Sequence, residues 1–236
     1  MRKVKVTNVQ SSWDYERLSE ACHKVGCILC RLTGETTRRY LETWKDEMFT
    51  DVNVRTTLRS SRGFCHTHTW QLVQMGASLP LAQAYRDIIT DEIEQLANDS
   101  GKHKQRWFHS KSDDTSSSTA PCPACQQSDQ SLARFTSSLR QAISDPTFYT
   151  LFLSSHGLCL DHFHLTCTLK PLTTPETWLP LLRTAQLTIL QHLNDQLNEL
   201  IRKYDYRYKN EAPGPEMTSW QTAAALVAGE PTPPPQ

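Results

Sequence analysis

The chain has 236 residues, and its 25 basic and 25 acidic side chains give a formal net charge of zero. Proteins built mainly to hold nucleic acid usually carry a basic excess, so this balance argues against that class. Hydrophobic residues make up 38% of the chain, which is below the usual share in globular domains.

Amphipathic helices account for the first half of the chain. Residues 1–12 look frayed, and apolar side chains then recur at helical spacing. Helices are predicted over residues 13–25, 31–49, 51–60, 64–75 and 80–96. Asp51 suits an N-cap, and Gly63 suits the left-handed turn that ends a helix. The buried stripe of the fifth helix is expected to comprise Leu81, Ala84, Tyr85, Ile88, Ile89 and Ile93.

A polar linker over residues 99–121 separates the two halves of the chain. Its segment Asp113–Thr119 has no apolar period and is expected to be disordered. The preceding segment Lys102–His109 interleaves basic and aromatic residues, a pattern that can contact nucleic acid. We favour the simpler interpretation, in which this segment is the solvated flank of the linker.

The second half follows the same helical plan. Helices are predicted over 126–143, from Pro146, after Cys159, over 176–204 and over 216–228. Near-heptad apolar spacing in the longest helix is broken at Gln186, and packing within the chain is favoured over a coiled-coil dimer. In the last helix, Trp220, Leu226 and Val227 are expected to pack on the body. We find no convincing strand, so the predicted fold class is all-α.

One ligand pattern, Cys-x-x-Cys and then Gly-x-Cys-x-x-His, occurs in each half. Three thiols and one imidazole form the ligand set of a closed tetrahedral zinc site. A Cys-x-x-His pair on a first helical turn places both side chains on one face. The spacing therefore predicts two zinc ions. The predicted ligands are Cys27, Cys30, Cys65 and His68 in the first copy and Cys122, Cys125, Cys159 and His162 in the second.

The recurrence indicates an internal duplication. A period near 95 residues is too long for a solenoid repeat, and Arg39-Tyr40 matches Arg134-Phe135 at the same distance after each Cys-x-x-Cys. We expect two helical modules, each with its own Cys3His site, packed into one bundle. In the first module the metal would join the start of helix 31–49 to the start of helix 64–75. The expected divisions are 13–98, the linker 99–121, 122–205 and a tail over 206–236.

Two other interpretations of the cysteines are weaker. Eight unrelated buried side chains would leave the recurrence unexplained, and two Cys-x-x-Cys redox centres would leave half of the pattern without a role. The residue types do not distinguish zinc from iron, because thiolates bind both. The side chains interpreted as non-ligands are Cys22, His23, His66 and His164. No signal peptide or membrane-spanning run is found, so we expect a reducing, cytoplasmic location.

These motifs resemble a bacterial and archaeal family of uncharacterised proteins catalogued as domain of unknown function 6062. The resemblance covers most of residues 15–228. The segments that carry it are Cys27–Leu32, Arg39–Glu42, Ser61–His68, Cys122–Cys125, Gly157–His162 and Ser219-Trp220. The chain departs from the family pattern at Ile28, where a proline is typical, and in its expanded linker. The resemblance supports the fold and the sites but implies no reaction.

No catalytic set is recognisable, because the sequence has no phosphate-binding Gly-rich loop, H-E-x-x-H or G-x-S-x-G. An enzyme is therefore not favoured, and no catalytic residue is assigned. The leading hypothesis is a structural zinc protein that acts as an interaction or adaptor module for a protein partner. A thiol/zinc redox sensor is the alternative, followed by a metal-dependent enzyme or a nucleic-acid binder. The oligomeric state is left open, and no membrane partner is expected.

Overall fold

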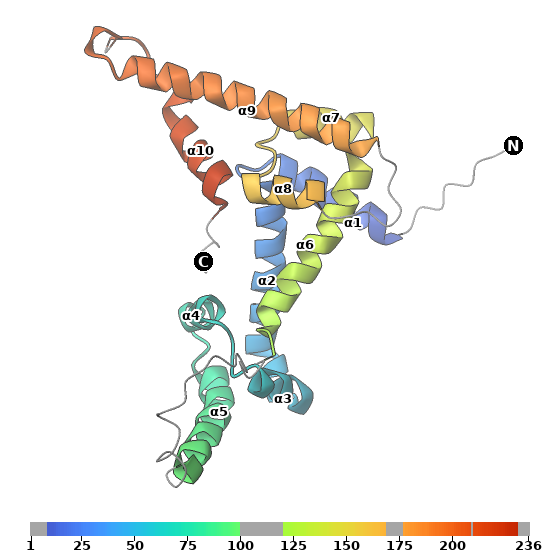
Figure 1. Cartoon of the computed structure of the whole chain (residues 1–236), viewed down its shortest axis with the longest axis vertical. Helices are drawn as coiled ribbons and strands as arrows, with labels where there is room; N and C mark the ends of the chain where they lie inside the picture. The colour runs from blue at the N-terminus through green and yellow to red at the C-terminus, as the bar shows by residue number, and fades with distance from the viewer. Residues whose placement is uncertain (1–8, 100–119, 169–176, 209, 231–236) are drawn as a thin grey trace, which may run out of the picture. The chain divides into compact units, whose positions relative to one another are not determined.

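The computed structural model describes residues 9–99, 120–168, 177–208 and 210–230 (Figure 1). Within these ranges all regular elements are helical, which confirms the predicted all-α class. The α-helices are α1 (Val9–Cys22), α2 (Ile28–Asp46), α3 (Val52–Ser60), α4 (His66–Gln74), α5 (Ser78–Asp99), α6 (Pro123–Ala142), α7 (Pro146–Leu153), α8 (Leu160–Thr168), α9 (Trp178–Lys203) and α10 (Ser219–Ala228). Three short 3-10 helices are η1 (Met48–Thr50), η2 (Tyr206–Tyr208) and η3 (Pro215–Thr218).

The chain divides into two compact units, and each unit draws on both halves of the sequence. Unit 1 comprises residues 1–35 and 130–233, and unit 2 comprises residues 36–129 and 234–236. The boundaries fall within α2 and α6, so unit 1 holds the start of α2 and the end of α6. Unit 2 holds the end of α2 and the start of α6. The compact units therefore do not coincide with the two sequence copies.

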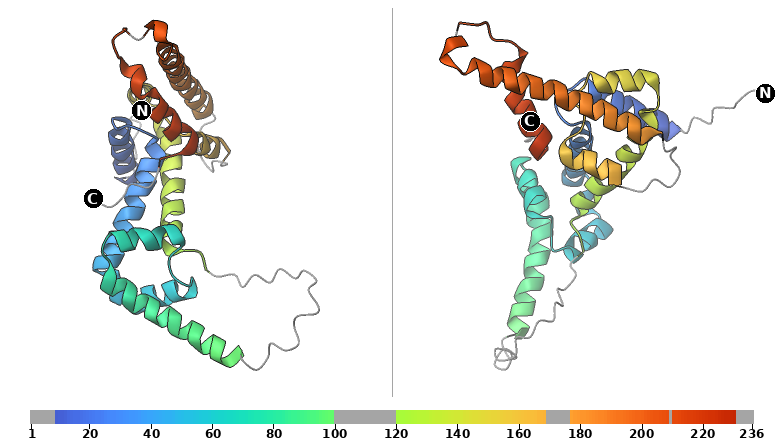
Figure 2. Two further views of the ribbon diagram at one scale, coloured as in Figure 1. Left: turned by 90° about the vertical axis from the view of Figure 1, so that its left-hand side faces the viewer. Right: turned by 45° about the horizontal axis from the view of Figure 1, so that its top comes forward.

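Unit 1 is organised around a core to which α1, α2, α6, α7 and α9 contribute. Its largest fully buried side chains include Phe135, Phe148 and Phe152. The apolar stripe of α9 faces this core through Leu182 and Ile189, as expected for packing within the chain. The right-hand view in Figure 2 shows α9 as a long rod, and α10 packs back against it.

Unit 2 has a smaller core centred on an aromatic pair. Trp44 of α2 is fully buried and meets Phe64 edge-to-face at a centroid distance of 5.0 Å. Helices α3 and α5 run alongside and are joined by ion pairs between Arg55 and Asp87 and between Arg59 and Asp91. Exposed ion pairs contribute little individually, so the buried core around Trp44 and Phe64 contributes more to the stability of this unit.

The predicted roles of Asp51, Gly63 and Gly157 are confirmed, and Asp145 has a capping role that was not predicted. Asp51 caps α3, since its Oδ1 accepts the backbone N–H groups of Asn53 and Val54 at 2.8 and 3.0 Å. Asp145 caps α7 in the second copy. Gly63 and Gly157 have φ angles of 97° and 68°, the left-handed region that glycine adopts without strain.

Some predicted burial is wrong. Ile89 and Ile93, together with Leu96, form an exposed stripe on the second half of α5 instead of a buried one. Trp220 and Val227 on α10 are also exposed, and Leu226 is buried as expected. An amphipathic pattern identifies the apolar face of a helix but does not say that the same chain covers it.

Several predictions lie outside the described residues. They concern residues 1–8 of the expected frayed start, the disordered segment Asp113–Thr119, the basic-aromatic segment Lys102–His109 and the proline-rich tail. The expected fraying of residues 9–12 is wrong, because α1 begins at Val9. Among the helices that the structure describes, none is both long enough and apolar enough to cross a membrane.

Candidate metal centres

All eight predicted ligands gather in two Cys3His groups, but the groups exchange partners between the copies. Site 1 consists of Cys27, Cys30, Cys159 and His162, and site 2 consists of Cys65, His68, Cys122 and Cys125. Each Cys-x-x-Cys therefore joins the Cys-x-x-His of the other copy. The expectation that each copy forms its own site is wrong, as is the expected link between the start of α2 and the start of α4.

The helix lengths fit the exchange. Helix α2 ends at Asp46, so it carries the chain about 24 Å from Cys30 at 1.5 Å per residue. Helix α3 has nine residues and can return at most about 13 Å, so it ends well short of Cys30. Helices α6 and α7, with 20 and eight residues, impose the same mismatch in the second copy. Site 1 lies wholly in unit 1 and site 2 wholly in unit 2.

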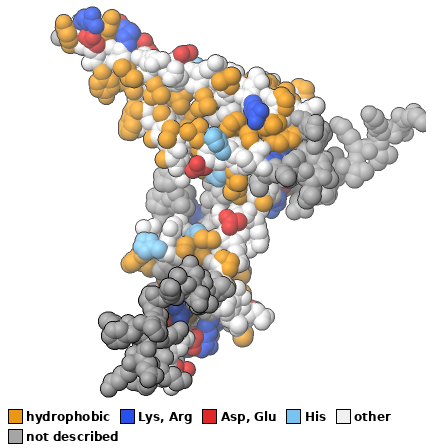
Figure 3. Space-filling view, in the orientation of Figure 1, with side chains coloured by type: hydrophobic (Ala, Val, Ile, Leu, Met, Phe, Trp, Pro, Cys, Tyr) orange, Lys and Arg blue, Asp and Glu red, His pale blue; other side chains and the backbone are white. Residues whose placement is uncertain are grey.

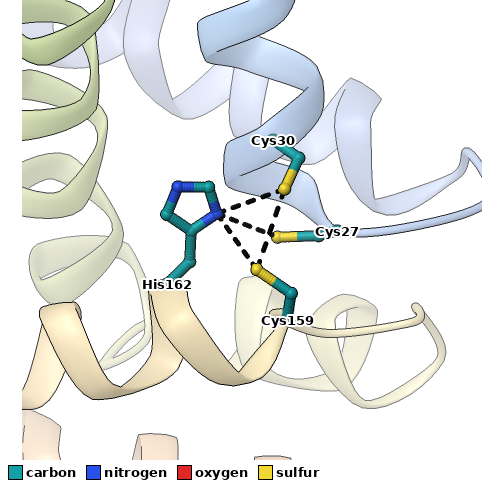
Figure 4. Close-up of side chains that lie close together, drawn as sticks. All are labelled: Cys27, Cys30, Cys159 and His162. Atoms are coloured by element: carbon teal, nitrogen blue, oxygen red, sulfur yellow. Dashed lines mark hydrogen bonds between the residues drawn. The ribbon is translucent and has the colours of Figure 1, made fainter. Parts of the chain in front are cut away.

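Site 1 is built from the first turns of α2 and α8 (Figure 4). Nδ1 of His162 lies 3.5 Å from the sulfur of Cys27, 3.3 Å from that of Cys30 and 3.2 Å from that of Cys159. The sulfurs of Cys30 and Cys159 are 3.7 Å apart. The three sulfurs thus lie together on the Nδ1 side of the imidazole ring.

Site 2 repeats this arrangement at the first turns of α4 and α6. Nδ1 of His68 lies 3.1 Å from the sulfur of Cys65, 3.6 Å from that of Cys122 and 3.5 Å from that of Cys125. The sulfurs of Cys65 and Cys125 are 3.7 Å apart, the same separation as the corresponding pair in site 1.

These separations fit one tetrahedral metal ion in each group. With Zn–S near 2.3 Å and Zn–N near 2.0–2.1 Å, tetrahedral angles place sulfurs about 3.8 Å apart and sulfur and nitrogen about 3.6 Å apart. Both groups come close to these values. A disulfide would need a sulfur–sulfur distance of about 2.05 Å, and all eight cysteines are free. The geometry therefore favours metal ligation over Cys-x-x-Cys redox centres.

The surroundings favour a thiolate at Cys122 and Cys159, whose pKa values are lowered, but not at Cys27 and Cys125, where neighbouring thiols and burial raise the pKa. Each pair lies at a helix N-terminus, where unpaired N–H groups stabilise negative charge. Burial alone would raise the pKa of Cys122, but hydrogen bonds from His68 and backbone amides lower it to about 6. Burial lowers the pKa of His162, whereas hydrogen bonds with Cys159 and Cys30 raise it to about 10. Protons and a metal ion would therefore compete for these ligands.

A buried glutamine on α9 positions the ligand turn of site 1. Gln186 Nε2 donates to the carbonyl of Leu158 at 2.8 Å, and its Oε1 accepts the Leu158 N–H at 3.1 Å. The backbone of Gly157 also accepts the N–H of Ile28 at 3.3 Å, which ties the two ligand segments together. In the sequence, Gln186 was interpreted only as a break in an apolar stripe. That break is the feature from which its positioning role could have been predicted.

Site 2 has a different support. The hydroxyl groups of Tyr85 and Thr69 lie 2.7 Å apart, and Thr69 also donates to the carbonyl of Phe64 at 3.1 Å. The turn before Cys65 is therefore held by hydroxyl groups of α4 and α5. Sequence reasoning assigned Tyr85 only to a buried stripe.

The end of α10 covers site 1. A carbon atom added at Gly229 would lie 3.7 Å from the sulfur of Cys30. Glu230 is partly buried and lies 4.0 Å from Arg31. Burial raises the pKa of the Glu230 carboxyl, and Arg31 opposes that change. Cys27 and Cys159 are buried, whereas all four ligands of site 2 are partly exposed.

The side chains predicted as non-ligands stay outside both groups. Cys22 is buried in the core, where burial raises the pKa of its thiol to about 12. His23, His66 and His164 belong to neither site. Among the described residues, no other group of histidine, cysteine and carboxylate side chains is dense enough to hold a metal ion.

The sequence comparisons agree with these motifs. A family described as a family of unknown function (DUF6062) matches residues 17–230. The curated proteins and the solved structures compared with the chain gave no match. The matched segment contains all eight ligands of the two sites and most of the chain. The chain therefore belongs to the DUF6062 family of unknown function.

Proposed function

We propose that the protein binds two zinc ions as structural cross-links and acts as a helical interaction module. The observation that carries the metal assignment is that each site brings together four ligand atoms within 4.8 Å of one another. Four protein ligands fill a tetrahedral zinc ion and leave no position for substrate or water. The metal would thus hold the fold and perform no catalysis.

Each ion would join segments that are far apart in the sequence. Site 1 connects Cys30 with Cys159, and site 2 connects Cys65 with Cys125. A structural zinc site stabilises the folded state by about 10 kcal/mol or more at neutral pH, which is comparable to the whole stability of a typical domain. Free thiols can hold the metal in a reducing compartment, so a cytoplasmic location suits the proposal.

Metal stoichiometry in paired variants tests both the metal and the exchange of ligands. We expect about two zinc ions per chain, by elemental analysis of the full-length protein, since each site is complete. Cys27→Ser with Cys159→Ser removes ligands from one site and should leave one ion. Cys27→Ser with Cys65→Ser removes a ligand from each site and should leave neither site intact.

Pairing within each copy would give the opposite result for the two double variants. Fewer than one metal ion per purified wild-type chain would refute the structural metal sites altogether. If the protein contains iron in place of zinc, the two metal sites stand and only the identity of the metal changes.

The exposed stripe of α5 supports the interaction role. Ile89, Ile93 and Leu96 have exposed fractions of 58%, 60% and 65%, and they lie on one face of the helix. A helix face of this kind fits an apolar groove or helix of a protein partner. We expect Ile93→Glu to abolish capture of a specific partner from cell extract without changing zinc content. Val52→Glu, at another exposed apolar position, is the matched control.

A thiol/zinc sensor is the second candidate, and the exposure of site 2 favours it. Peroxide could oxidise two thiolates to one disulfide while it is reduced to water, and the ion would leave. Cys65 and Cys125, whose sulfurs are 3.7 Å apart, are a suitable pair. Zinc release at low peroxide, accompanied by a Cys65–Cys125 disulfide identified by peptide mass spectrometry and unchanged in Cys22→Ser, would support sensing. No release at modest oxidant concentration argues for a purely structural role.

A further inference from the structure

Two residues that follow α10 lie against site 1, although they are far from its ligands in the sequence. A carbon atom added at Gly229 would lie 3.7 Å from the sulfur of Cys30. The next side chain, that of Glu230, is only 22% exposed. Glu230 does not belong to the group of four ligands, so it acts on the site from outside. Gly229 and Glu230 are called the C-terminal lid below.

The first ligand segment provides a seat for the carboxyl group of the lid. This carboxyl group occupies the space in which a side chain at position 26 would lie, and Gly26 leaves that space open. The backbone N–H of Cys27 donates a hydrogen bond to the same carboxyl group. Cys27 directly precedes α2, where the N–H groups have no partner inside the helix. Glu230 therefore satisfies a donor of a ligand residue and restrains the turn that carries its sulfur.

Arg31 holds the seat together from the other side. Its guanidinium lies 4.0 Å from the Glu230 carboxylate, and it also donates to the backbone carbonyl of Val25. The side chain of Arg31 is 26% exposed, so solvent screens this ion pair less than it screens a surface pair. The positive charge of Arg31 also offsets the negative charge that Glu230 brings near the ligand thiols.

The fold of unit 1 brings the lid to site 1. Helix α10 packs against α9 and against α8, the helix that carries His162. Leu226 of α10 is buried, and hydrophobic side chains gather along α9 and α10 on the face shown in Figure 3. Before α10, Lys203 donates to the buried carboxylate of Glu216 at 2.8 Å, which ties η3 to the end of α9. These contacts fix the helix from which the lid extends.

The second copy of the ligand pattern lacks both residues that seat Glu230. Pro121 stands in the place of Gly26, and Gln126 stands in the place of Arg31. The proline ring would fill the space that Gly26 leaves open, and glutamine has no charge to pair with a carboxylate. All four ligands of site 2 are partly exposed. The seat for a lid is thus a property of site 1.

We propose that Gly229 and Glu230 form a lid that slows the release of the metal ion from site 1 and shields the sulfur of Cys30 from reagents. A chelator takes a thiolate-bound ion in steps, so it must reach a ligand sulfur or wait until a ligand turn loosens. The lid opposes both events, because it covers Cys30 and restrains Cys27. This inference rests on the proposed metal binding, and it makes site 2 the site that exchanges its ion faster.

Zinc transfer from the full-length, zinc-loaded protein to 4-(2-pyridylazo)resorcinol tests the lid. The absorbance should rise in a fast phase for site 2 and a slow phase for site 1, and Cys159→Ser should remove the slow phase. Glu230→Ala should accelerate the slow phase at least about fivefold, because it removes a hydrogen bond to a charged group. Glu230→Gln retains an acceptor for the Cys27 N–H and should give an intermediate rate.

Glu211→Ala is the matched control for the transfer experiment. Glu211 also pairs with an arginine, Arg202, but it is a ligand of neither site, so this variant should leave both phases unchanged. Thermal melting shows that each variant is folded. A single phase for both ions of the wild type, an unchanged slow phase in Glu230→Ala, or equal acceleration of both phases would overturn the proposal.

A second measurement needs no metal ion. In the metal-free full-length protein, N-ethylmaleimide should alkylate Cys30 at least about threefold faster in Glu230→Ala than in the wild type, and the rate at Cys125 should not change. Peptide mass spectrometry gives both rates. This measurement separates the two proposals: fewer than one metal ion per wild-type chain refutes the metal sites, whereas an unchanged rate at Cys30 refutes the lid.

Discussion

The two units have the same ligand set in nearly the same geometry, but the surroundings of the two sites differ. Among the described residues of unit 1, the core cluster contains 19 buried residues, and Cys27 and Cys159 are among them. Among those of unit 2, the core cluster contains eight buried residues, and none of them is a ligand. Site 1 is thus part of a hydrophobic core, whereas site 2 stands beside a core that is less than half as large.

This difference shows that one ligand pattern can serve two physical purposes. A small unit buries too little apolar surface to offset the conformational entropy of folding. A metal ion bound by the four ligands would supply the missing stabilisation, as in other small metal-dependent folds. Unit 2 should therefore depend on its ion for folding, whereas the ion of unit 1 should add stability to a core that already exists.

Metal removal should separate the units and give the largest effect. A strong chelator should unfold unit 2, since the loss of about 10 kcal/mol exceeds what its small core can supply. Unit 1 should keep protected helices. Hydrogen exchange measures this directly: amides of α3 and α4 should lose protection, and those of α7 and α9 should retain most of it.

The comparison fails if both units lose protection together or if unit 1 unfolds first. Cys122→Ser and Cys159→Ser are matched single variants, each removing one sulfur from one site. The first should reproduce the loss of unit 2 without chelator, and the second should leave unit 2 protected.

The positioning glutamine should matter only in unit 1. Gln186→Leu leaves both backbone groups of Leu158 without partners, which should cost about 2–4 kcal/mol of unfolding free energy. Gln191→Leu makes the same substitution at an exposed position of the same helix and should cost less than about 0.5 kcal/mol. Denaturant titration, monitored with probes located in unit 1, measures both changes in unfolding free energy. Equal effects would mean that Gln186 does not position the ligand turn.

The two ligand-turn glycines should differ in their tolerance of a side chain. A carbon atom at Gly157 would lie 2.8 Å from Oε1 of Gln186 and 3.0 Å from Cδ1 of Ile189. A carbon atom at Gly63 would lie 3.2 Å from Cε1 of Tyr85. Both positions also have positive φ, which costs about 1–2 kcal/mol for alanine.

Gly157→Ala should therefore destabilise unit 1 more than Gly63→Ala destabilises unit 2. Thermal melting with zinc present compares the two variants. If Gly63→Ala has the larger effect, then the ligand turn of site 2 is packed more tightly than that of site 1.

The ligands and most helices could be predicted from the sequence, but the pairing could not. Metal-ligand spacing and helical periodicity are local properties of the sequence. The ligand role of Cys27 and the capping role of Asp51 could therefore be recognised from the residues around them. The pairing depends on where the chain returns in space. The separation between the second and third ligands is 34 residues in one copy and 33 in the other, which does not distinguish pairing within a copy from exchange. The lengths of α2 and α3 favour exchange, but the pairing is fixed by the path of the chain in space, which ligand spacing does not encode.

Acid should affect unit 1 through a group that is not a ligand, and this is the smallest expected effect. Burial, aided by Arg31, lowers the pKa of His156 in the folded protein. The unfolded chain therefore binds a proton more readily near its ordinary pKa of about 6.5. Stability from this group is present above that pH and is lost as the pH falls toward the folded pKa.

His156→Gln cannot titrate, so the stability of unit 1 should fall less steeply between about pH 7 and pH 5. Denaturant titrations across this range give the two slopes, and equal slopes would show that burial of His156 does not contribute. Because metal ligands titrate in both proteins, the difference between the slopes isolates His156 from them.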